Sequence, residues 1–364
     1  MRARRMPRLL ALLTAGALLV GCSAQAPSEV PAVDALVNLY DQTSGVWPTT
    51  GWWNSANALT ALTNYMIDSG DHRYSWVLAN TYAKKVNAEQ RNFINPYIDD
   101  TGWWALAWIR AYDLTGDKRY LATARAGVDF MWRNHDDVCG GGLWWTTTHR
   151  YKNAIANELF VKAAAELATR LGDAGKPYLQ QALSVWEWFD RSGMTNAGQL
   201  VGDGLDRMSC TSSGPVWTYN QGVVLGALVD LAKATGDGNY LDRARTFADA
   251  STRSEELHID GVLTESCEKD GCDINGPSFK GIYVRNLGEL NLALDDHPYS
   301  DYLLGQANIA HEHDRNTDDQ YGLHWAGPVA YVSAASQQSA VDLLVAAQPV
   351  EDTADATQSS GSSP

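Results

Sequence analysis

The sequence predicts an all-α domain in which six helical hairpins form a closed toroid. One phrase recurs along the chain, an apolar helix-like run followed by a Gly-Asp turn and a tyrosine, with copies at residues 64–74, 111–121, 167–179 and 231–241 and a degraded copy at 292–303. Self-similarity at intervals of about 45 to 65 residues is typical of stacked helical hairpins. Little of the chain shows the period-two alternation that half-buried strands require.

The turns divide the chain into helices of two kinds. We expect helices before the turns over about residues 55–69, 102–115, 153–171, 219–235 and 281–294. We expect helices after the turns over about residues 74–90, 118–134, 177–191, 239–253 and 300–314. The apolar segment 326–347 and the early segment 33–43 complete a sixth pair. Glycine stops the first helix of a pair, and Asp or a neighbouring polar residue caps the second.

The composition of the helices predicts an inner and an outer ring. The helices before the turns are rich in Ala, Gly and Leu and nearly apolar on all sides, which is typical of buried helices. The helices after the turns carry charge on one stripe. All inner helices then begin at one rim, with the aromatic and polar stretches TTGWWNSAN, PYIDDTGWW, HRYKNAIANE, VWTYNQG, FKGIYVRN and YGLHWAG. We expect chemistry at this rim and only short connections at the other.

The N-terminus predicts export. Residues 1–21 have a basic start and a short apolar core, as in a signal peptide. The ending LVGC resembles a bacterial lipobox, which predicts lipidation of Cys22; an ordinary cleaved signal with a chance cysteine is the alternative. We expect a tether at 22–32, one domain at 33–347 and a polar, disordered tail at 348–364. No later apolar run could span a bilayer, so the lipid alone would hold the protein at the outer face of a bacterial membrane.

The charge restricts the partners. Removing residues 1–21 deletes four arginines and no acidic residue, which changes the formal charge from −15 to −19. A surface this acidic disfavours binding to nucleic acid and to anionic membranes. It does not exclude neutral ligands such as carbohydrates. We expect a monomer.

The remaining four cysteines predict two disulfides, because an even number in an exported chain is most simply paired. Cys267 and Cys272 close a tight loop and form the favoured pair, which leaves Cys139 with Cys210, although three pairings are open. A zinc site lacks support, since there is no C-x-x-C motif or neighbouring histidine. The stretch CDING (272–276) resembles a calcium loop but lacks the preceding Asp and the distal Glu. No metal or other cofactor is expected.

Two adjacent acids, Asp99 and Asp100, stand just before the second inner helix. In a non-helical segment, neighbouring side chains can flank one bound group. Glycoside hydrolysis uses two carboxyl groups, about 5–5.5 Å apart in retaining enzymes and about 6.5–9.5 Å apart in inverting ones. Sequence neighbours suit the shorter distance, and their mutual repulsion raises one pKa. The alternative is that Asp100 is a helix N-cap and Asp99 a solvated neighbour.

Aromatic and polar residues at the same rim are candidates for substrate binding. Three tryptophan doublets, Trp52-Trp53, Trp103-Trp104 and Trp144-Trp145, could stack on sugar rings or fill the core instead. The candidate contacts among them are Trp52, Trp53, Trp103, Trp144 and Trp145. The polar candidates, which could equally be caps or buried hydrogen-bond partners, are Asn54, Asn153, Asp203, Asp206, Tyr219, Asn220, Gln221, Lys280 and Arg285.

Long ordered motifs carry a resemblance to a known family. GWWNSANAL, YIDDTGWWALAWIRAYDLTGDKRYL, CGGGLWW, KNAIANELF, VWTYNQGVVLGALVDLAKATGD and FKGIYVRNL resemble glycoside hydrolase family 76, the bacterial and fungal endo-α-1,6-mannanases. The resemblance covers about residues 33–346. It implies an (α/α)6 barrel that hydrolyses α-1,6-linked mannose backbones with retention, with Asp99 as nucleophile and Asp100 as acid/base.

The expected function is therefore endo-acting cleavage of α-1,6-mannan at the cell surface. One alternative is a transglycosidase acting on α-mannosyl glycans of the cell wall, because a covalent intermediate also permits attack by an acceptor sugar. Another is a non-catalytic surface lipoprotein that binds mannan, although a binding module does not need two crowded carboxylates.

Overall fold

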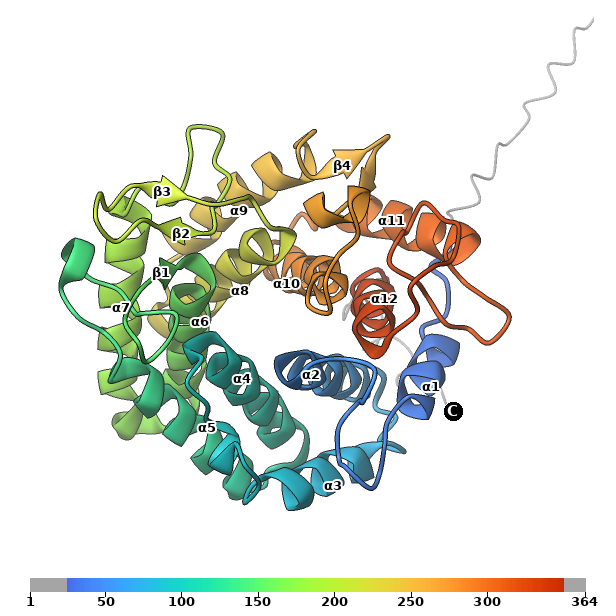
Figure 1. The fold of residues 1–364 in the computed structure, drawn as a ribbon, viewed down its shortest axis with the longest axis horizontal. Helices are drawn as coiled ribbons and strands as arrows, with labels where there is room; N and C mark the ends of the chain where they lie inside the picture. Colours follow the sequence, from blue (N-terminus) through green and yellow to red (C-terminus); the bar gives the residue numbers. More distant parts are fainter. Residues whose placement is uncertain (1–24, 350–364) are drawn as a thin grey trace, which may run out of the picture.

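Twelve helices lie within residues 25–349, the part of the chain that the computed structural model describes, and they form two concentric rings (Figure 1). The inner ring consists of α2 (Trp52–Ser69), α4 (Ile98–Thr115), α6 (Ala154–Arg170), α8 (Thr218–Thr235), α10 (Phe279–Ala293) and α12 (Ala334–Ala346). The outer ring consists of α1 (Val30–Asn38), α3 (Ser75–Lys85), α5 (Lys118–Trp132), α7 (Lys176–Arg191), α9 (Asn239–Thr252) and α11 (Ser300–His313). Helix α12 packs against α2, which closes the inner ring. The predicted all-α toroid, an (α/α)6 barrel, is confirmed.

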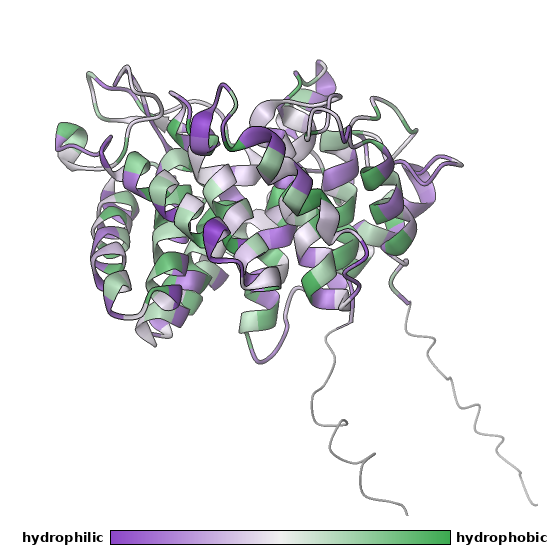
Figure 2. Ribbon diagram, turned by 90° about the horizontal axis from the view of Figure 1, so that it is seen from below, coloured by the Kyte–Doolittle hydropathy of each residue, from purple (hydrophilic) through white to green (hydrophobic). Residues whose placement is uncertain are grey.

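The connections differ in length at the two ends of the barrel. Inner helices lead to outer ones through short turns, whereas the longer segments that lead back to an inner helix gather along one edge (Figure 2). These longer segments contain the strands β1 (Lys152–Asn153), β2 (Gly204–Leu205) and β3 (Ser212–Ser213), which pair antiparallel in that order, and the hairpin of β4 (His258–Ile259) and β5 (Val262–Leu263). They also contain the 3-10 turns η1 (Arg91–Phe93), η2 (Val138–Gly140), η4 (Ser266–Lys269) and η5 (Gly276–Ser278), whereas η3 (Gly172–Gly175) lies in a short turn.

Glycine ends three of the inner helices as predicted, whereas α6 and α10 are followed by leucine and α12 by alanine. Gly70, Gly116 and Gly236 follow α2, α4 and α8 with φ of 68°, 71° and 74°, a left-handed conformation that costs glycine little. After the second of these turns, the Asp117 side chain accepts a hydrogen bond from the backbone N–H of Arg119 and so caps α5. The repeated Gly-Asp phrase is therefore the place where the chain reverses from the inner to the outer ring.

The small residues of the inner helices allow their backbones to approach closely. A Cβ on Gly222 of α8 would collide with the backbone of Tyr283 on α10, and one on Gly281 of α10 would collide with the backbone of Ser339 on α12. Larger side chains fill the space between the rings, among them Trp47, Trp104 and Trp108, all fully buried. The inner ring is therefore tight at its helix contacts and surrounded by an aromatic layer.

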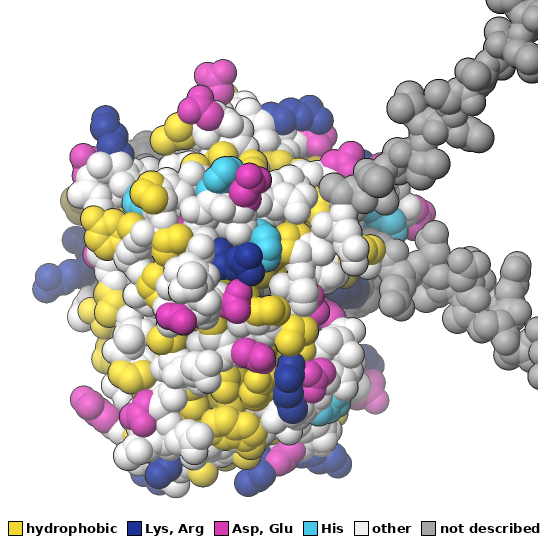
Figure 3. Space-filling model, turned by 90° about the vertical axis from the view of Figure 1, so that its right-hand side faces the viewer, with side chains coloured by type: hydrophobic (Ala, Val, Ile, Leu, Met, Phe, Trp, Pro, Cys, Tyr) yellow, Lys and Arg dark blue, Asp and Glu magenta, His cyan; other side chains and the backbone are white. Residues whose placement is uncertain are grey.

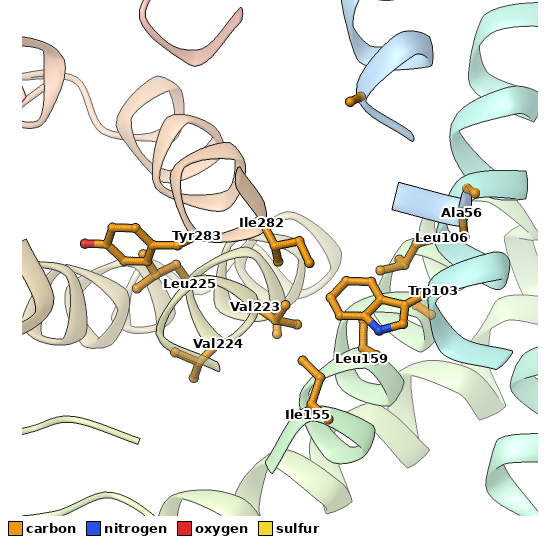
Figure 4. Close-up of a cluster of buried hydrophobic side chains, with 14 of the residues drawn as sticks. Ala56, Trp103, Leu106, Ile155, Leu159, Val223, Val224, Leu225, Ile282 and Tyr283 are labelled. Carbon is orange, nitrogen blue, oxygen red and sulfur yellow. The ribbon is translucent and has the colours of Figure 1, made fainter. Parts of the chain in front are cut away.

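The inside of the barrel is closed below the rim. Trp103 lies among the apolar side chains of Leu106, Leu159 and Val223, which come from three inner helices (Figure 4). Below this layer is a group of charged side chains: Lys162 Nζ lies 2.6 Å from Glu289 and 2.8 Å from Asp230. Arg110 also contacts Glu289, and Arg285 contacts Asp342. The inner helices are largely buried, as expected, but they also carry these ion pairs, which the sequence analysis did not predict.

Several element boundaries differ from the prediction. Helix α4 begins at Ile98, so it includes Asp99 and Asp100, and α12 begins at Ala334, so YGLHWAG lies in the loop before it. Helix α1 begins at Val30, which brings residues 30–32 of the expected tether into the fold. The predicted signal at 1–21, Cys22 and the tail beyond residue 349 lie outside the described residues.

Both favoured disulfides are present, Cys139–Cys210 and Cys267–Cys272, with sequence separations of 71 and 5 residues. Among the described helices, none combines the length and the apolar character needed to cross a bilayer. The face in Figure 3 carries acidic and basic side chains interspersed with apolar ones.

Candidate active site

Asp99 and Asp100 lie in the first turn of α4, at the rim where the long connections gather. The N-cap is Tyr97, which makes no side-chain cap, so neither aspartate is the N-cap. The expectation that they precede the helix is wrong. Backbone N–H groups in a first helical turn lack intrahelical partners, and here the N–H of Asp100 donates to Oδ1 of Asp99 at 3.0 Å. The helix start therefore supplies a hydrogen bond to one of the two carboxyl groups.

Two side chains from outside the helix hold the pair. Trp145, in the connection between α5 and α6, donates from Nε1 to Oδ2 of Asp99 at 2.8 Å. Asn95, in the segment before α4, donates from Nδ2 to Oδ2 of Asp100 at 2.6 Å. The two aspartates are thus each bonded to a different neighbour, although they are adjacent in the chain.

The surroundings raise the pKa of both carboxyl groups. Burial is the main cause, and it raises the pKa of Asp99 well above its ordinary value, with a further contribution from the charge of Asp100. Burial also raises the pKa of Asp100 to about 6, against the opposing hydrogen bond from Asn95. Two interacting carboxyl groups titrate as a pair, so there is a range of pH in which one is neutral and the other ionised. This is the state that paired acid and nucleophile chemistry needs.

Aromatic rings from four inner helices form the floor beside the pair. Trp53 of α2 stacks on Trp103 of α4 with ring centroids 5.7 Å apart, and Tyr219 of α8 stacks on Phe279 of α10 at 4.1 Å. Trp103 and Tyr219 connect the two pairs at 6.5 Å. Of the tryptophans predicted to meet a substrate, Trp53 and Trp103 lie in this floor.

Two exposed rings stand on the rim next to Asp99. Trp145 is 37% exposed and Tyr97 is 46% exposed, and their ring centroids are 5.5 Å apart. The connection that carries Trp145 is tied to the start of α4, since the N–H of Ile98 donates to the carbonyl of Trp145. Tyr97 was not among the predicted contacts, although its place directly before the acidic pair was a usable signal.

Further acidic groups surround Tyr219. Burial raises the pKa of its hydroxyl, and the charges of Asp203 and Asp99 add to this effect. Asp203 accepts a hydrogen bond from the Tyr151 hydroxyl at 2.7 Å. Glu158 of α6 is buried, which raises its pKa well above the usual range. Glu158 ends the stretch HRYKNAIANE that was predicted to lie at the rim, but it was not among the predicted contacts.

Asn54 and Asn220 are buried near the rim rather than open to it. Asn54 donates from Nδ2 to the Ser278 hydroxyl. Neither side-chain atom of Asn220 has a hydrogen-bond partner among residues 25–349. Both are next in sequence to rings of the floor, Trp53 and Tyr219, but both side chains are buried.

Seven other predicted contact residues make contacts within the protein. Trp52 packs on Phe93 and Trp104 between the rings, and buried Trp144 stacks on His149. Four polar residues bind backbone groups: Asn153 caps α6, Asp206 accepts from the N–H of Ser209, and Gln221 bonds to both backbone groups of Val201. The fourth, Lys280, donates to the carbonyl of Leu323 and forms an ion pair with Glu268. Arg285 belongs to the ion pairs inside the barrel. These residue types also serve as caps and buried hydrogen-bond partners, and sequence alone did not separate the two uses.

Comparison with protein families matches residues 32–359 to the model of glycosyl hydrolase family 76. The protein named mannan endo-1,6-alpha-mannosidase DCW1 of Saccharomyces cerevisiae is 28% identical over 280 residues, which is 69% of this chain and 60% of the relative. Mannan endo-1,6-alpha-mannosidase DFG5 of the same yeast is 28% identical over 260 residues, 65% of this chain and 56% of the relative. The chain thus spans less than two thirds of the length of these relatives.

Solved structures match over more of their length. The GH76A alpha-1,6-mannanase from Salegentibacter sp. HEL1_6 has a TM-score of 0.79 and 25% identity, covering 88% of this chain and 97% of that chain. An inactive variant of that enzyme, in which two consecutive aspartates are replaced by alanine, is bound to an α-1,6-linked mannotetraose and has a TM-score of 0.78, 25% identity and the same coverage. With the family match over most of its length, the chain belongs to glycosyl hydrolase family 76.

Proposed function

We propose that this protein is a retaining, endo-acting glycoside hydrolase that cleaves α-1,6-mannosidic bonds in mannan backbones. One observation carries the proposal: adjacent carboxyl groups with raised pKa values lie at the mouth of the barrel, beside stacked aromatic rings. The names of the yeast relatives and of the Salegentibacter enzyme support the substrate. The inactive relative that lacks two consecutive aspartates supports the role of the pair.

In the proposed mechanism, Asp99 is the nucleophile. Its carboxylate attacks the anomeric carbon while Asp100 gives its proton to the leaving glycosidic oxygen, which breaks the bond and leaves a covalent mannosyl–Asp99 ester. Asp100, now ionised, removes a proton from water. The water oxygen then attacks the anomeric carbon and the ester bond to Asp99 breaks. The mannan fragment leaves with a new reducing end of retained configuration, Asp99 is again a carboxylate, and Asp100 is again protonated.

Hydrogen bonding supports this division of roles. Oδ1 of Asp99 accepts from the N–H of Asp100 and Oδ2 accepts from Trp145, and donors of this kind favour an ionised carboxylate. Asp100 accepts at Oδ2 alone among the contacts within residues 25–349. The strongly raised pKa of Asp99, caused by burial and by the charge of Asp100, acts in the opposite direction. Positive charge on the sugar in the transition state would favour ionised Asp99. The start of α4 also favours negative charge.

The aromatic and acidic surroundings suit a neutral sugar that becomes cationic at the transition state. Trp145 and Tyr97 offer exposed faces for stacking next to Asp99. Asp203 and Asp99 place negative charge close to Tyr219, and negative charge stabilises an oxocarbenium-like transition state. The exported, lipid-anchored location inferred from residues 1–22 would bring the site to polysaccharide outside the cell.

Asp99→Asn and Asp100→Asn test the proposal against linear α-1,6-mannan. Each variant should lose roughly 10²–10⁴-fold in kcat, because each removes a group that acts in bond cleavage, while circular dichroism shows an unchanged fold. New reducing ends measure turnover, and NMR of the first-formed anomer measures retention.

Mass spectrometry with and without added acceptor separates hydrolysis from transfer. Full activity in either variant, or an inverted first product, would contradict the mechanism. Tight mannan binding by the unaltered protein without any cleavage would instead favour a binding role.

A further inference from the structure

Asn95 makes three hydrogen bonds around the start of α4. Its backbone N–H donates to Oγ1 of Thr101 at 3.4 Å, and its side-chain Oδ1 accepts from the backbone N–H of Tyr97 at 2.9 Å. Its Nδ2 donates to Oδ2 of Asp100 at 2.6 Å. The Asn95 side chain therefore connects the backbone of the helix start to one oxygen of one catalytic carboxyl group.

The orientation of the Asn95 amide follows from these partners. A backbone N–H can only donate, so the atom that faces Tyr97 must be the oxygen. The NH₂ group is consequently the one that faces Asp100. An amide held at both ends presents a donor, and never an acceptor, to that carboxyl group.

The segment that carries Asn95 is itself held in place. Two residues earlier, Phe93 is 2% exposed, with its ring 4.9 Å from Trp104 and 4.7 Å from Trp108. Asn92 and Phe93 have φ of 58° and 60°, which non-glycine residues adopt at a cost. Such conformations persist only where the surroundings enforce them, and they cluster at functional sites. The buried phenylalanine ring provides that enforcement two residues before Asn95.

We propose that Asn95 is the positioning residue of Asp100: it occupies Oδ2, so the transferred proton resides on Oδ1 and that oxygen faces the scissile bond. This rests on the proposed function of the aspartate pair. The donor stabilises ionised Asp100, which favours the state needed to activate water in the second step. Removing it should leave the proton free to sit on either oxygen and should slow both steps.

The pKa of Asp100 depends on its burial and on the hydrogen bond from Asn95, and Asp100 interacts with the neighbouring carboxyl group of Asp99. The other titratable groups nearby surround Tyr219. Asp99 is the neighbouring charge on α4, and Tyr219 of α8 responds to Asp99. Asp203 and Glu158 act on Tyr219 from the β2 segment and from α6. Trp145, from the connection before α6, is neutral. Among these groups, Asn95 is the hydrogen-bond donor to Asp100.

Asn95→Ala and Asn95→Asp test the role in the full-length protein. Asn95→Ala removes both the Nδ2 donor to Asp100 and the Oδ1 acceptor for the N–H of Tyr97. Asn95→Asp keeps an acceptor for Tyr97 and replaces the Nδ2 donor by a carboxyl oxygen. Asn196→Ala is the matched control, because Oδ1 of exposed Asn196 likewise accepts a backbone N–H, that of Leu200, in a loop.

In both Asn95 variants kcat should fall about 10- to 100-fold with KM within about twofold. The alkaline limb of kcat/KM should move up by roughly half to one pH unit in Asn95→Ala, since loss of one donor raises the pKa of the acid. The shift should be larger in Asn95→Asp, and the control should change neither quantity.

Carbon-13 NMR titration of the aspartate side chains, with Asp99→Asn and Asp100→Asn for assignment, measures the same shift without substrate. An unchanged titration in a folded Asn95→Asp would overturn the positioning role even if the wild type cleaves mannan. A wild type that does not cleave mannan, with the shift present, would contradict the proposed function and leave the hydrogen-bond role supported. If Asn95→Ala does not fold, the titration of Asn95→Asp alone tests the positioning role.

Discussion

At the residue scale, the two aspartates show how adjacent side chains acquire different environments. Successive residues of a helix point about 100° apart, so Asp99 and Asp100 turn toward different neighbours even in one helical turn. Trp145 bonds to the first and Asn95 to the second. Only the first also accepts the N–H of its neighbour. The asymmetry of the pair is therefore built from its contacts, not from its residue types.

Replacing Trp145 by Phe tests the donor to Asp99, the proposed nucleophile. The variant keeps an aromatic ring but loses the Nε1–H that favours ionised Asp99, so the pKa of Asp99 should rise. If Asp99 is the nucleophile it must be ionised, so activity is lost as pH falls through this pKa, and the acidic limb of kcat/KM should move to higher pH by roughly half to one unit.

The pH profile on α-1,6-mannan measures the shift. Trp76→Phe, which changes a similarly exposed tryptophan on α3 of the outer ring, is the control. A limb that moves equally in both variants, or in neither, would show that the indole N–H does not govern Asp99.

At the element scale, the inner ring depends on helix contacts that leave no room for a Cβ. Gly222 and Gly281 each face the backbone of the next inner helix, and this explains why Gly and Ala are frequent in these segments. The same closeness fixes the starts of the helices, and with them the spacing of the rings that form the floor. The Ala- and Gly-rich composition was visible in the sequence, but which glycine touches which helix was not.

Gly281→Ala should lower stability by about 1–3 kcal/mol or more, because the added methyl group meets the backbone of Ser339 and the two helices must separate. Gly305→Ala on the outer helix α11 is the matched control. Nothing lies near a Cβ at that position, so the change should stabilise by roughly 0.5–1 kcal/mol through helix propensity.

Urea unfolding of both variants measures the difference. Equal effects of the same sign would argue against close packing as the reason for the inner glycines.

At the scale of the whole molecule, buried carboxyl groups determine how stability varies with pH. Burial raises the pKa of Asp314 to about 8 and that of Glu265 to about 7. A carboxyl group with a raised pKa binds its proton more tightly in the folded state than in the unfolded chain. Its contribution is present at low pH and is lost as pH rises through the folded value.

We therefore expect the free energy of unfolding to fall between about pH 5 and pH 8, by at most about 1.4 kcal/mol per pH unit for each group. Glu289 acts in the opposite sense, since Lys162 and Arg110 hold its pKa below the usual range despite burial, so its contribution is lost in more acidic solution. Maximum stability should lie near pH 5.

Asp314→Asn isolates the largest of these contributions. The amide cannot ionise, so the variant should lose less stability than the wild type between pH 6 and 8, as measured by calorimetry across that range. Asp318→Asn, an exposed position in the same connection, should keep the wild-type slope. An unchanged slope in Asp314→Asn would show that this carboxyl group does not titrate in the folded protein near neutral pH.

The sequence by itself determined the twelve helices, their division into two rings, the rim, the adjacent acids and the favoured cysteine pairs. Those features follow from local periodicity, turn glycines and short spacings, and family motifs added the expected chemistry of Asp99 and Asp100. Only the tertiary structure decided that Trp145 bonds to Asp99 across 46 residues, that Trp52 and Trp144 pack inward, and that ion pairs fill the barrel. The physical reason is that helix formation depends on neighbours along the chain. The partner of a polar or aromatic side chain depends on which helix faces it once the ring has closed.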